Sequence, residues 1–323
     1  MHPGGAGVDP ELARDWVSSQ VAGLGGTLTD AGTAHGRRAW SHTTVFGTTL
    51  GRVWLKANAQ GTAHEPRLHR LLAGLVPDLL PALLAVDEPR GWSLLADAGP
   101  TLRTVAGIEA QLGAWEQLLP RYAEAQLAMA AHRDDLLRAG VPERSPTTLP
   151  GQAAALVAEL GTLAEDRGGL GPDRRAALEA RLPAYGRWCA DLAGSGLPDT
   201  VQHDDLHSAN VCLDGDTLRI LDWGDASLGH PFGTMLVTLN SVAHHAGLDS
   251  RDPLVLRVRD VYLEPFTAYA EHRDLIHLVD RARQAGRVTR ALAWRAALAT
   301  EPPEAHAEWD FPVRAWLEEI LRD

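Results

Sequence analysis

The feature that most constrains the fold is a polar loop held between short apolar strands, just before a β-hairpin. The pattern predicts a strand at 200–202, a polar loop at 203–210, a strand at 211–213, a turn at 214–216 and a strand at 218–221. A turn this short between two apolar runs is typical of a hairpin. The hairpin places Asn210, at its start, beside Asp222, which follows its second strand. The fold must therefore bring these two polar side chains together at one end of the hairpin.

Three side chains of this segment carry oxygen atoms suited to hard cations and protons. Asn210 and Asp222 offer the kind of ligand that Mg²⁺ prefers, and Mg²⁺ often shares its coordination shell with substrate phosphates. Asp205, on the same loop, is then free to accept a proton from an attacking hydroxyl. This is the arrangement of the catalytic loop and metal-binding aspartate in kinase-type phosphoryl transfer.

The motif also carries a family resemblance. The spacing His-x-Asp-x-x-x-x-Asn is the kinase signature in general form. The chain has H-D-D-L-H-S-A-N-V at 203–211 and L-D-W-G-D-A at 221–226. These motifs resemble those of the aminoglycoside phosphotransferase and choline kinase-like family, which usually has H-G-D-L-H-x-x-N and then I-D-W or I-D-F. The resemblance extends from Trp40 to about Leu239.

The resemblance implies an α+β fold of the two-lobed, protein-kinase-like type. A small β-rich N-lobe would occupy 1–97 and bind the nucleotide, and a large, mainly helical C-lobe would occupy 98–323. It further implies ATP or GTP as phosphate donor, Mg²⁺ as cofactor and a hydroxyl of a small molecule as acceptor. An aminoglycoside, another amino sugar, an amino alcohol and a plain sugar all remain open as the acceptor.

The chain has 30 Lys and Arg residues together, and Lys56 is its single lysine. A slim ammonium can approach phosphate oxygens in a way that a planar guanidinium does not reproduce. Lys56 lies near the end of an expected strand, and Glu65 begins the helix expected at 64–75. The resemblance implies that Lys56 grips the nucleotide phosphates and that Glu65 holds it there. The alternatives are a surface lysine and a solvated glutamate at a helix start.

Two further small-lobe segments are expected to contact the nucleotide. On the kinase register Trp40 to Thr43 forms the phosphate loop, where Ser41 and His42 offer polar groups, although an ordinary turn would contain such residues too. The loop is not glycine-rich. The resemblance implies that the hinge, whose backbone faces adenine, lies at Leu95, Ala96 and Asp97.

His203 and His207, which flank Asp205, are expected to orient the loop by hydrogen bonds. Asp204 stands where the family usually has glycine, and we expect it to face away from the base, toward an arginine or solvent. Asp204, Asp225 and His230 are the expected substrate-side residues, and for Asp225 a role in binding metal is an alternative. His230 also departs from the aspartate that relatives commonly have there.

Before residue 101, apolar periodicity predicts a helix at 10–21 and strands at 44–46, 53–55, 82–86 and 92–96. After residue 101 the pattern is mostly helical. The predicted helices there are 108–137 (with Pro120 as a possible break), 152–163, 174–192, 236–246, 253–272 and 275–298. A Pro-rich loop is expected at 141–150.

Composition narrows the class of protein. A length of 323 residues suits two lobes, and 45% hydrophobic residues suffice for a core. A net charge of −12 disfavours a nucleic-acid partner. Met1 to Gly5 lacks signal-peptide features, no apolar run approaches the length of a membrane helix, and two cysteines fit a reducing compartment. We expect a cytoplasmic monomer or homodimer with no membrane partner.

Two alternatives from other classes remain. His203, Asp204 and His207 superficially suggest a metal-dependent phosphohydrolase of the HD type, but such a site needs further ligands on helices. A kinase-like module that binds nucleotide without catalysis would not need the lysine, the base and the metal ligands together. A nucleotide-turnover assay with Mg²⁺ separates the three.

Overall fold

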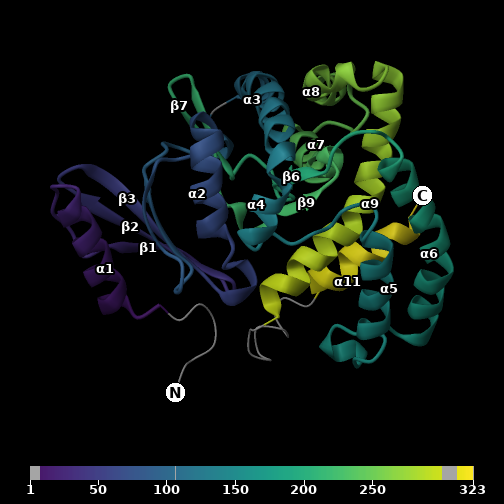
Figure 1. Ribbon diagram of the computed structural model, residues 1–323, viewed down its shortest axis with the longest axis horizontal. Coiled ribbons are helices and arrows are strands. Elements are labelled where there is room, and N and C mark those ends of the chain that lie inside the picture. The colour runs from purple at the N-terminus through teal and green to yellow at the C-terminus, as the bar shows by residue number, and fades with distance from the viewer. Residues whose placement is uncertain (1–7, 106, 300–310, 323) are drawn as a thin grey trace.

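A computed structural model describes residues 8–105, 107–299 and 311–322 of the chain. Met1 to Gly5, on which the expectation about a signal peptide rests, lies outside these residues. A five-stranded antiparallel sheet forms the small lobe, with strand order β1-β2-β3-β5-β4 (Figure 1). Its strands are β1 (Thr33–Arg37), β2 (Ser41–Thr48), β3 (Gly51–Asn58), β4 (Leu83–Asp87) and β5 (Trp92–Ala96).

The sheet is packed between two helices, α1 (Pro10–Gly23) and α2 (Glu65–Leu75) (Figure 1). Val17 and Val21 of α1 share a core with Phe46, Leu55 and other sheet residues. Asp9 caps α1 by accepting the backbone N–H groups of its first turn, as an N-cap aspartate does. Leu68 and Leu72 of α2 are fully buried against the large lobe, so α2 lies between the sheet and that lobe.

The large lobe is a bundle of helices around two small sheets. Its helices are α3 (Ile108–Met129), α4 (Arg133–Arg138), α5 (Leu149–Leu160), α6 (Pro172–Ala193), α7 (Met235–Ala246), α8 (Pro253–Leu263), α9 (His272–Leu298) and α11 (Phe311–Glu318). Its strands are β6 (Thr200–Gln202) with β9 (Ser227–Gly229), and β7 (Val211–Asp214) with β8 (Thr217–Ile220). The expected α+β class, with a β-rich small lobe and a mainly helical large lobe, is confirmed.

The expected hairpin around the polar loop is present as β7 and β8, with Val211 paired to Ile220. β9 was not predicted, because its sequence, Ser-Leu-Gly, is too short to show a period of two. It pairs with β6 in antiparallel register, Val201 opposite Leu228. This pairing fixes the polar loop, which begins after β6, next to the segment that follows Asp222.

Three boundaries differ from the prediction. The long helix expected at 108–137 ends at Met129 and resumes as α4, but Pro120 does not break α3, because Leu118, Leu119 and Tyr122 around it are fully buried. The helix expected at 253–272 ends at Leu263, before the sequence Glu264-Pro265, since a residue preceding proline disfavours the helical conformation. α5 begins at Leu149, inside the expected Pro-rich loop.

The expected phosphate loop also shifts. Ser41, His42 and Thr43 belong to β2, where they pair in register with Asn58, Ala57 and Lys56 of β3. The connection between β1 and β2 is the shorter segment 38–40. The sequence showed no β1 because Thr33–Arg37 is largely exposed and has no apolar alternation.

No helix among residues 8–105, 107–299 and 311–322 is long and apolar enough to cross a membrane. β5 ends at Ala96, next to the boundary we predict between the lobes, and this division of the chain stays a prediction.

Candidate active site

Lys56 joins the two lobes at the centre of the candidate site. It projects from β3, and its Nζ lies 2.6 Å from Glu65 Oε2 on α2 and 2.5 Å from Asp222 Oδ1, which follows β8. Burial alone would lower the pKa of Lys56, but the Asp222 and Glu65 carboxylates outweigh it and hold the pKa above its ordinary value. The lysine is therefore a buried, permanent cation between two carboxylates.

Glu65 is positioned by the backbone as well as by Lys56. Its Oε1 accepts the N–H of Trp223 at 2.9 Å, so one carboxylate reaches from the small lobe to the segment after Asp222. The Glu65 side chain is only 5% exposed, which excludes the alternative of a solvated glutamate at a helix start. The Lys56 side chain is 11% exposed, which excludes the alternative of a surface lysine.

Asp222 has a left-handed backbone, with φ of 60°, between β8 and the 3₁₀ turn η6 (Trp223–Asp225). Burial would raise the pKa of Asp222, but Lys56 holds it below the ordinary value, so the group is ionised. Its side chain remains 53% exposed, which leaves a carboxylate oxygen accessible to a cation.

Asn210 faces the same space from the end of the catalytic loop. Its Nδ2 donates to the backbone oxygen of Asp205 at 3.0 Å, and its own backbone oxygen accepts from Leu221 at 2.8 Å. The amide oxygen is therefore the atom left for a cation. Among the described residues no cluster of three or more His, Cys, Asp or Glu could hold a metal. A site of one carboxylate and one amide oxygen fits Mg²⁺ bound together with substrate phosphates and water.

Asp205 is held by two basic side chains. Its Oδ1 lies 3.0 Å from Arg290 of α9, and its Oδ2 lies 3.4 Å from Nε2 of His207. Burial alone would raise the pKa of Asp205, but Arg290, followed by His207, holds the pKa below its ordinary value. The carboxylate is thus ionised and oriented, with 27% of its side chain exposed.

The two histidines of the loop take the orienting positions expected of them. His207 Nδ1 accepts the N–H of Ala209 at 3.2 Å, which leaves Nε2 facing Asp205. His203 is fully buried, and burial lowers its pKa, so its ring is neutral. Its Nε2 lies 2.6 Å from the oxygen of Leu221 and donates to it, which ties the loop to β8 and Asp222. Their catalytic roles remain a prediction.

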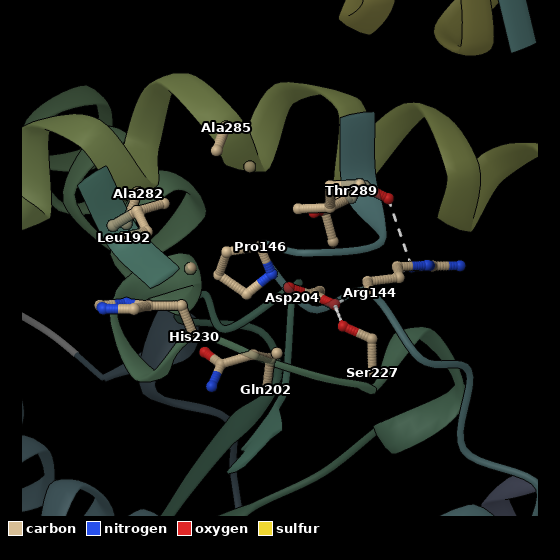
Figure 2. A pocket seen from close by; sticks show the side chains of 14 residues that line it. Arg144, Pro146, Leu192, Gln202, Asp204, Ser227, His230, Ala282, Ala285 and Thr289 are labelled. Carbon is tan, nitrogen blue, oxygen red and sulfur yellow. Dashed lines mark hydrogen bonds and ion pairs between the residues drawn. The ribbon is translucent and has the colours of Figure 1, made fainter. Parts of the chain in front are cut away.

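Asp204 points toward a cavity that Arg144 and Ser227 also line (Figure 2). It has φ of 57°, is 4% exposed, accepts a hydrogen bond from Ser227 Oγ, and lies 3.9 Å from Arg144. Burial raises the pKa of Asp204 to about 6, opposed by Arg144. The cavity it lines has a volume of about 20 Å³, room for roughly one water molecule. Asp204 is therefore a buried carboxylate beside this cavity, and its contact with an acceptor stays a prediction.

His230 lines the same small cavity, and its predicted role toward a substrate likewise stays a prediction. It is 5% exposed, its Nδ1 accepts the N–H of Phe232 at 3.2 Å, and its Nε2 lies 3.3 Å from Ser195 Oγ. Burial lowers the pKa of His230 to about 3. The ring is a neutral packing group behind the catalytic loop. Asp225, in contrast, lies on the side of the base, with Oδ2 2.7 Å from Arg290.

The remaining small-lobe predictions lie along the sheet. Leu95 pairs with Trp54 and Ala96 with Val53, at the end of β5. Asp97 accepts from Trp54 Nε1 and from Arg52, both at 2.7 Å, so its side chain braces β3. Ser41 and His42 stand in β2, next to the β1–β2 connection and not within it. Their contact with a nucleotide stays a prediction.

Sequence analysis missed the two arginines of this site. Arg290 comes from α9, far along the chain, and Arg144 comes from the loop before α5. The signal for Arg290 was present, since Val288, Thr289 and Ala291 beside it are buried and a charged side chain in such a stretch requires a partner. The partner could not be named from the sequence.

Comparison with known proteins agrees with this geometry. The model of the phosphotransferase enzyme family matches residues 29–275. Among curated proteins none matches the chain. Solved structures with the same fold include macrolide 2′-phosphotransferase MphH from Brachybacterium faecium, with 16% identity, a TM-score of 0.59, and coverage of 94% of this chain and 98% of that one.

Two further neighbours have the same architecture. Choline kinase from Cryptosporidium parvum Iowa II is 11% identical, with a TM-score of 0.60 and coverage of 96% of this chain and 95% of that one. A thermostable mutant of aminoglycoside phosphotransferase APH(4)-Ia, in complex with ADP and hygromycin B, is 12% identical, with a TM-score of 0.55 and coverage of 96% and 97%. The expected protein-kinase-like fold is confirmed by this likeness. Since the family model matches well over half of the chain, the protein belongs to the phosphotransferase enzyme family and is a phosphotransferase.

Proposed function

We propose that this protein transfers the terminal phosphoryl group of ATP, or of GTP, to a hydroxyl group of a small molecule. The observation that carries the proposal is the convergence of Lys56, Glu65 and Asp222 in one ion-paired cluster. Asn210 bonds to the backbone of Asp205 and to that of Leu221, the residue before Asp222. Phosphoryl transfer depends mainly on positioning and charge stabilisation, and these are the groups that such a reaction requires.

On the donor side, Lys56 is the cation available to the nucleotide phosphates. Lys56, held by Glu65, would contact the phosphate oxygens of a bound nucleotide, and the Asp222 carboxylate beside it would be available to a metal. Asp222 and Asn210 would hold the Mg²⁺, which when bound neutralises charge on the phosphates. The segments 38–40 and 95–97 are the positions proposed to cover the phosphates and to face the base.

On the acceptor side, Asp205 would receive the hydroxyl. A carboxylate whose pKa is held low by Arg290 is a weak proton acceptor, so its main action is to orient the hydroxyl oxygen toward the phosphorus. The proton would pass to Asp205 late, as the bond to phosphorus forms. His207 would keep the second carboxylate oxygen in place.

The class of acceptor follows from the family only in outline. The neighbours are named as a macrolide 2′-phosphotransferase, a choline kinase and an aminoglycoside phosphotransferase. The last was solved with ADP and hygromycin B, which supports a nucleotide donor and a small hydroxyl compound as acceptor. Both cysteines, Cys189 and Cys212, are free, which is consistent with the cytoplasm, where ATP is available.

The test is nucleotide turnover with Mg²⁺ over a panel of hydroxyl compounds, comparing the wild type with Asp205→Asn. The variant keeps the shape of the side chain but not its basicity, so transfer should fall by ~10²–10⁴-fold while nucleotide binding stays near normal. A kcat within a few-fold of the wild type would remove Asp205 from its role. Nucleotide binding without turnover would favour a non-catalytic module, and hydrolysis of phosphate esters without nucleotide would favour a phosphohydrolase.

A further inference from the structure

Asp225 lies at the end of the turn that follows the metal-side carboxylate, Asp222. The turn η6 runs from Trp223 to Asp225, so Asp222 and Asp225 belong to one short segment. Trp223 anchors this segment, since its side chain is fully buried and its backbone N–H donates to Glu65 Oε1 at 2.9 Å. Asp225 is therefore carried at a fixed place relative to Asp222.

The guanidinium of Arg290 bridges Asp225 and the proposed proton acceptor, Asp205. Its Nη1 lies 2.7 Å from Asp225 Oδ2, and its Nη2 lies 3.0 Å from Asp205 Oδ1. Its Nε is also buried and has no hydrogen-bond partner within the described parts of the chain. The orientation of this planar group is thus set by two carboxylates, one on each terminal nitrogen.

The helix that carries Arg290 is itself held at two points beside the site. Arg144 Nη1 donates to the backbone oxygen of Thr289, the residue before Arg290, at 3.2 Å. About one turn earlier, the hydroxyl of Tyr185 on α6 donates to the backbone oxygen of Ala285 at 3.1 Å. Because both α9 and the turn η6 are fixed, a guanidinium that spans them leaves the carboxylate on its other side little freedom.

Resting on the proposed function, we infer that Asp225 is a positioning residue that holds Arg290, through which Asp205 is kept directed at the reacting hydroxyl. The proton-accepting carboxylate is thereby set in a fixed relation to Asp222, three residues before Asp225. The Oδ2 atom of Asp225 is committed to the ion pair with Arg290. This role differs from direct contact with metal or acceptor, the roles expected from the sequence, and kinetics distinguish them.

The first experiment measures ADP release from MgATP with water, glycerol or kanamycin as acceptor, for the wild type, Asp225→Ala and Asp225→Asn. Asp225→Ala should lower kcat at least about tenfold, because misplacing a reacting group is costly, and leave the KM for MgATP within about twofold. Asp225→Asn keeps an oxygen that accepts from Arg290, so it should recover part of the loss. A raised KM for MgATP or acceptor with unchanged kcat would show direct binding and overturn the inference.

The second experiment tests whether Asp225 acts through Arg290. Arg290→Lys keeps the charge, but one ammonium cannot present two nitrogen atoms to two carboxylates, so kcat should fall as in Asp225→Ala. The double variant should lie no more than about twofold below the slower single variant, since both act through one contact. Additive losses would mean that Asp225 acts independently of Arg290, which would overturn the inference.

The matched control is another arginine–carboxylate pair on α9. Arg295 Nε lies 2.7 Å from Oε1 of Glu159 on α5, and both side chains are partly exposed. Arg295→Lys and Glu159→Ala should leave kcat within about twofold of the wild type, because a partly exposed ion pair contributes little.

Hydrogen exchange, followed by mass spectrometry, decides the inference without turnover. The backbone amides of the loop 203–210 should exchange at least about threefold faster in Asp225→Ala than in the wild type, and at the wild-type rate in Glu159→Ala. If Asp225→Ala folds poorly, Asp225→Asn takes its place, with a smaller increase expected. Unchanged exchange in the loop would overturn the inference and leave the proposed function standing. Absence of MgATP turnover by the wild type would instead count against the proposed function, while the exchange result would still decide the role of Asp225.

Discussion

At the scale of single residues, Lys56 is the clearest case of a side chain whose chemistry cannot be exchanged. It is the single lysine of the chain, and it lies between Glu65 and Asp222 with 11% of its side chain exposed. Replacing it with arginine would keep the charge, but a guanidinium is wider and pairs with carboxylates through two parallel hydrogen bonds.

We predict that Lys56→Arg keeps the fold and loses most transfer activity. Glu65 would retain the guanidinium as a bidentate partner and withhold it from the phosphates. Glu65→Gln should lose less activity, and the double variant should lose far less than the sum of both effects, since both act through one contact. Kinetics at low ATP together with the melting temperature test this. A Lys56→Arg enzyme as active as the parent would show that no phosphate depends on this ammonium.

Asp204 permits a prediction about pH. Its pKa is raised from 3.8 in the unfolded chain to about 6 in the fold, so folding favours the protonated form. The contribution of this group to stability is therefore largest at low pH, falls as the pH rises from about 4 to about 6, and is constant above that.

The stability of Asp204→Asn relative to the wild type should accordingly increase as the pH rises from about 4 to about 6. Above about pH 6 the difference in stability between the two proteins should stay constant. Asparagine tolerates the left-handed backbone at this position, where φ is 57°. The measurement is the difference in melting temperature between the two proteins from about pH 4 to about pH 8. A difference independent of pH would mean that Asp204 ionises in the fold as it does in the unfolded chain.

At the scale of elements, α9 connects the acceptor side to the small lobe. Arg290 contacts the catalytic loop, while Trp294 packs edge-on against Trp40 of the β1–β2 connection, with ring centroids 5.0 Å apart. Near its end, α9 meets the 3₁₀ turn η1 (Gln60–Thr62), where a Cβ on Gly61 would lie 2.0 Å from the oxygen of Ala296. The helix therefore touches the backbone that leads from Lys56 to Glu65.

Gly61→Ala should therefore destabilise the protein and separate α9 from the small lobe, because the clash is with backbone that cannot turn aside. Overpacking of this kind costs about 1–3 kcal/mol. Gly186→Ala, in α6, is the matched control, since a Cβ there meets nothing within 4 Å. It should be neutral or stabilising, by about 0.5–1 kcal/mol. Chemical denaturation of both variants tests the pair, and equal stabilities would contradict the close approach.

At the scale of the whole molecule, the two lobes meet through the site itself. Lys56 and Glu65 of the small lobe bind Asp222 and the backbone of Trp223 in the large lobe. A ligand that replaces these contacts with its own, across both lobes, stabilises the folded state by mass action, by about 2.7 kcal/mol at a hundred times its Kd.

MgATP should therefore raise the melting temperature of the wild type, and Asp222→Ala should lose most of the part that requires Mg²⁺. Asp216→Ala is the control, because Asp216 is an exposed residue in the turn of the same hairpin. Melting curves with ATP, with and without Mg²⁺, distinguish the two. If Asp222→Ala responds to Mg²⁺ as the wild type does, the metal is held elsewhere.

Much of this architecture could be predicted because it is encoded locally. The hairpin β7–β8 follows from a short turn between two apolar runs, and α2 from its leucine spacing. Lys56, Asp205, Asn210 and Asp222 could be singled out because their residue types are those that phosphoryl transfer requires. The small elements β1 and β9 could not be predicted, since their strands exist through pairing and not through their own composition.

The sequence by itself therefore determined the secondary structure of the long elements, the family resemblance and the residues able to bind phosphate, metal and proton. Only the tertiary structure decided which charges neutralise one another. Arg290 pairs with Asp205 and Asp225, which lie 65 or more positions before it in the sequence. Arg144 pairs with Asp204, which lies 60 positions after it. Such pairing depends on how α9 and the loop before α5 pack, and side-chain periodicity reports the buried face of a helix but not its partner. The burial of Asp204 and His230 was likewise decided by the tertiary structure, because a polar residue type does not reveal which side of a loop it faces.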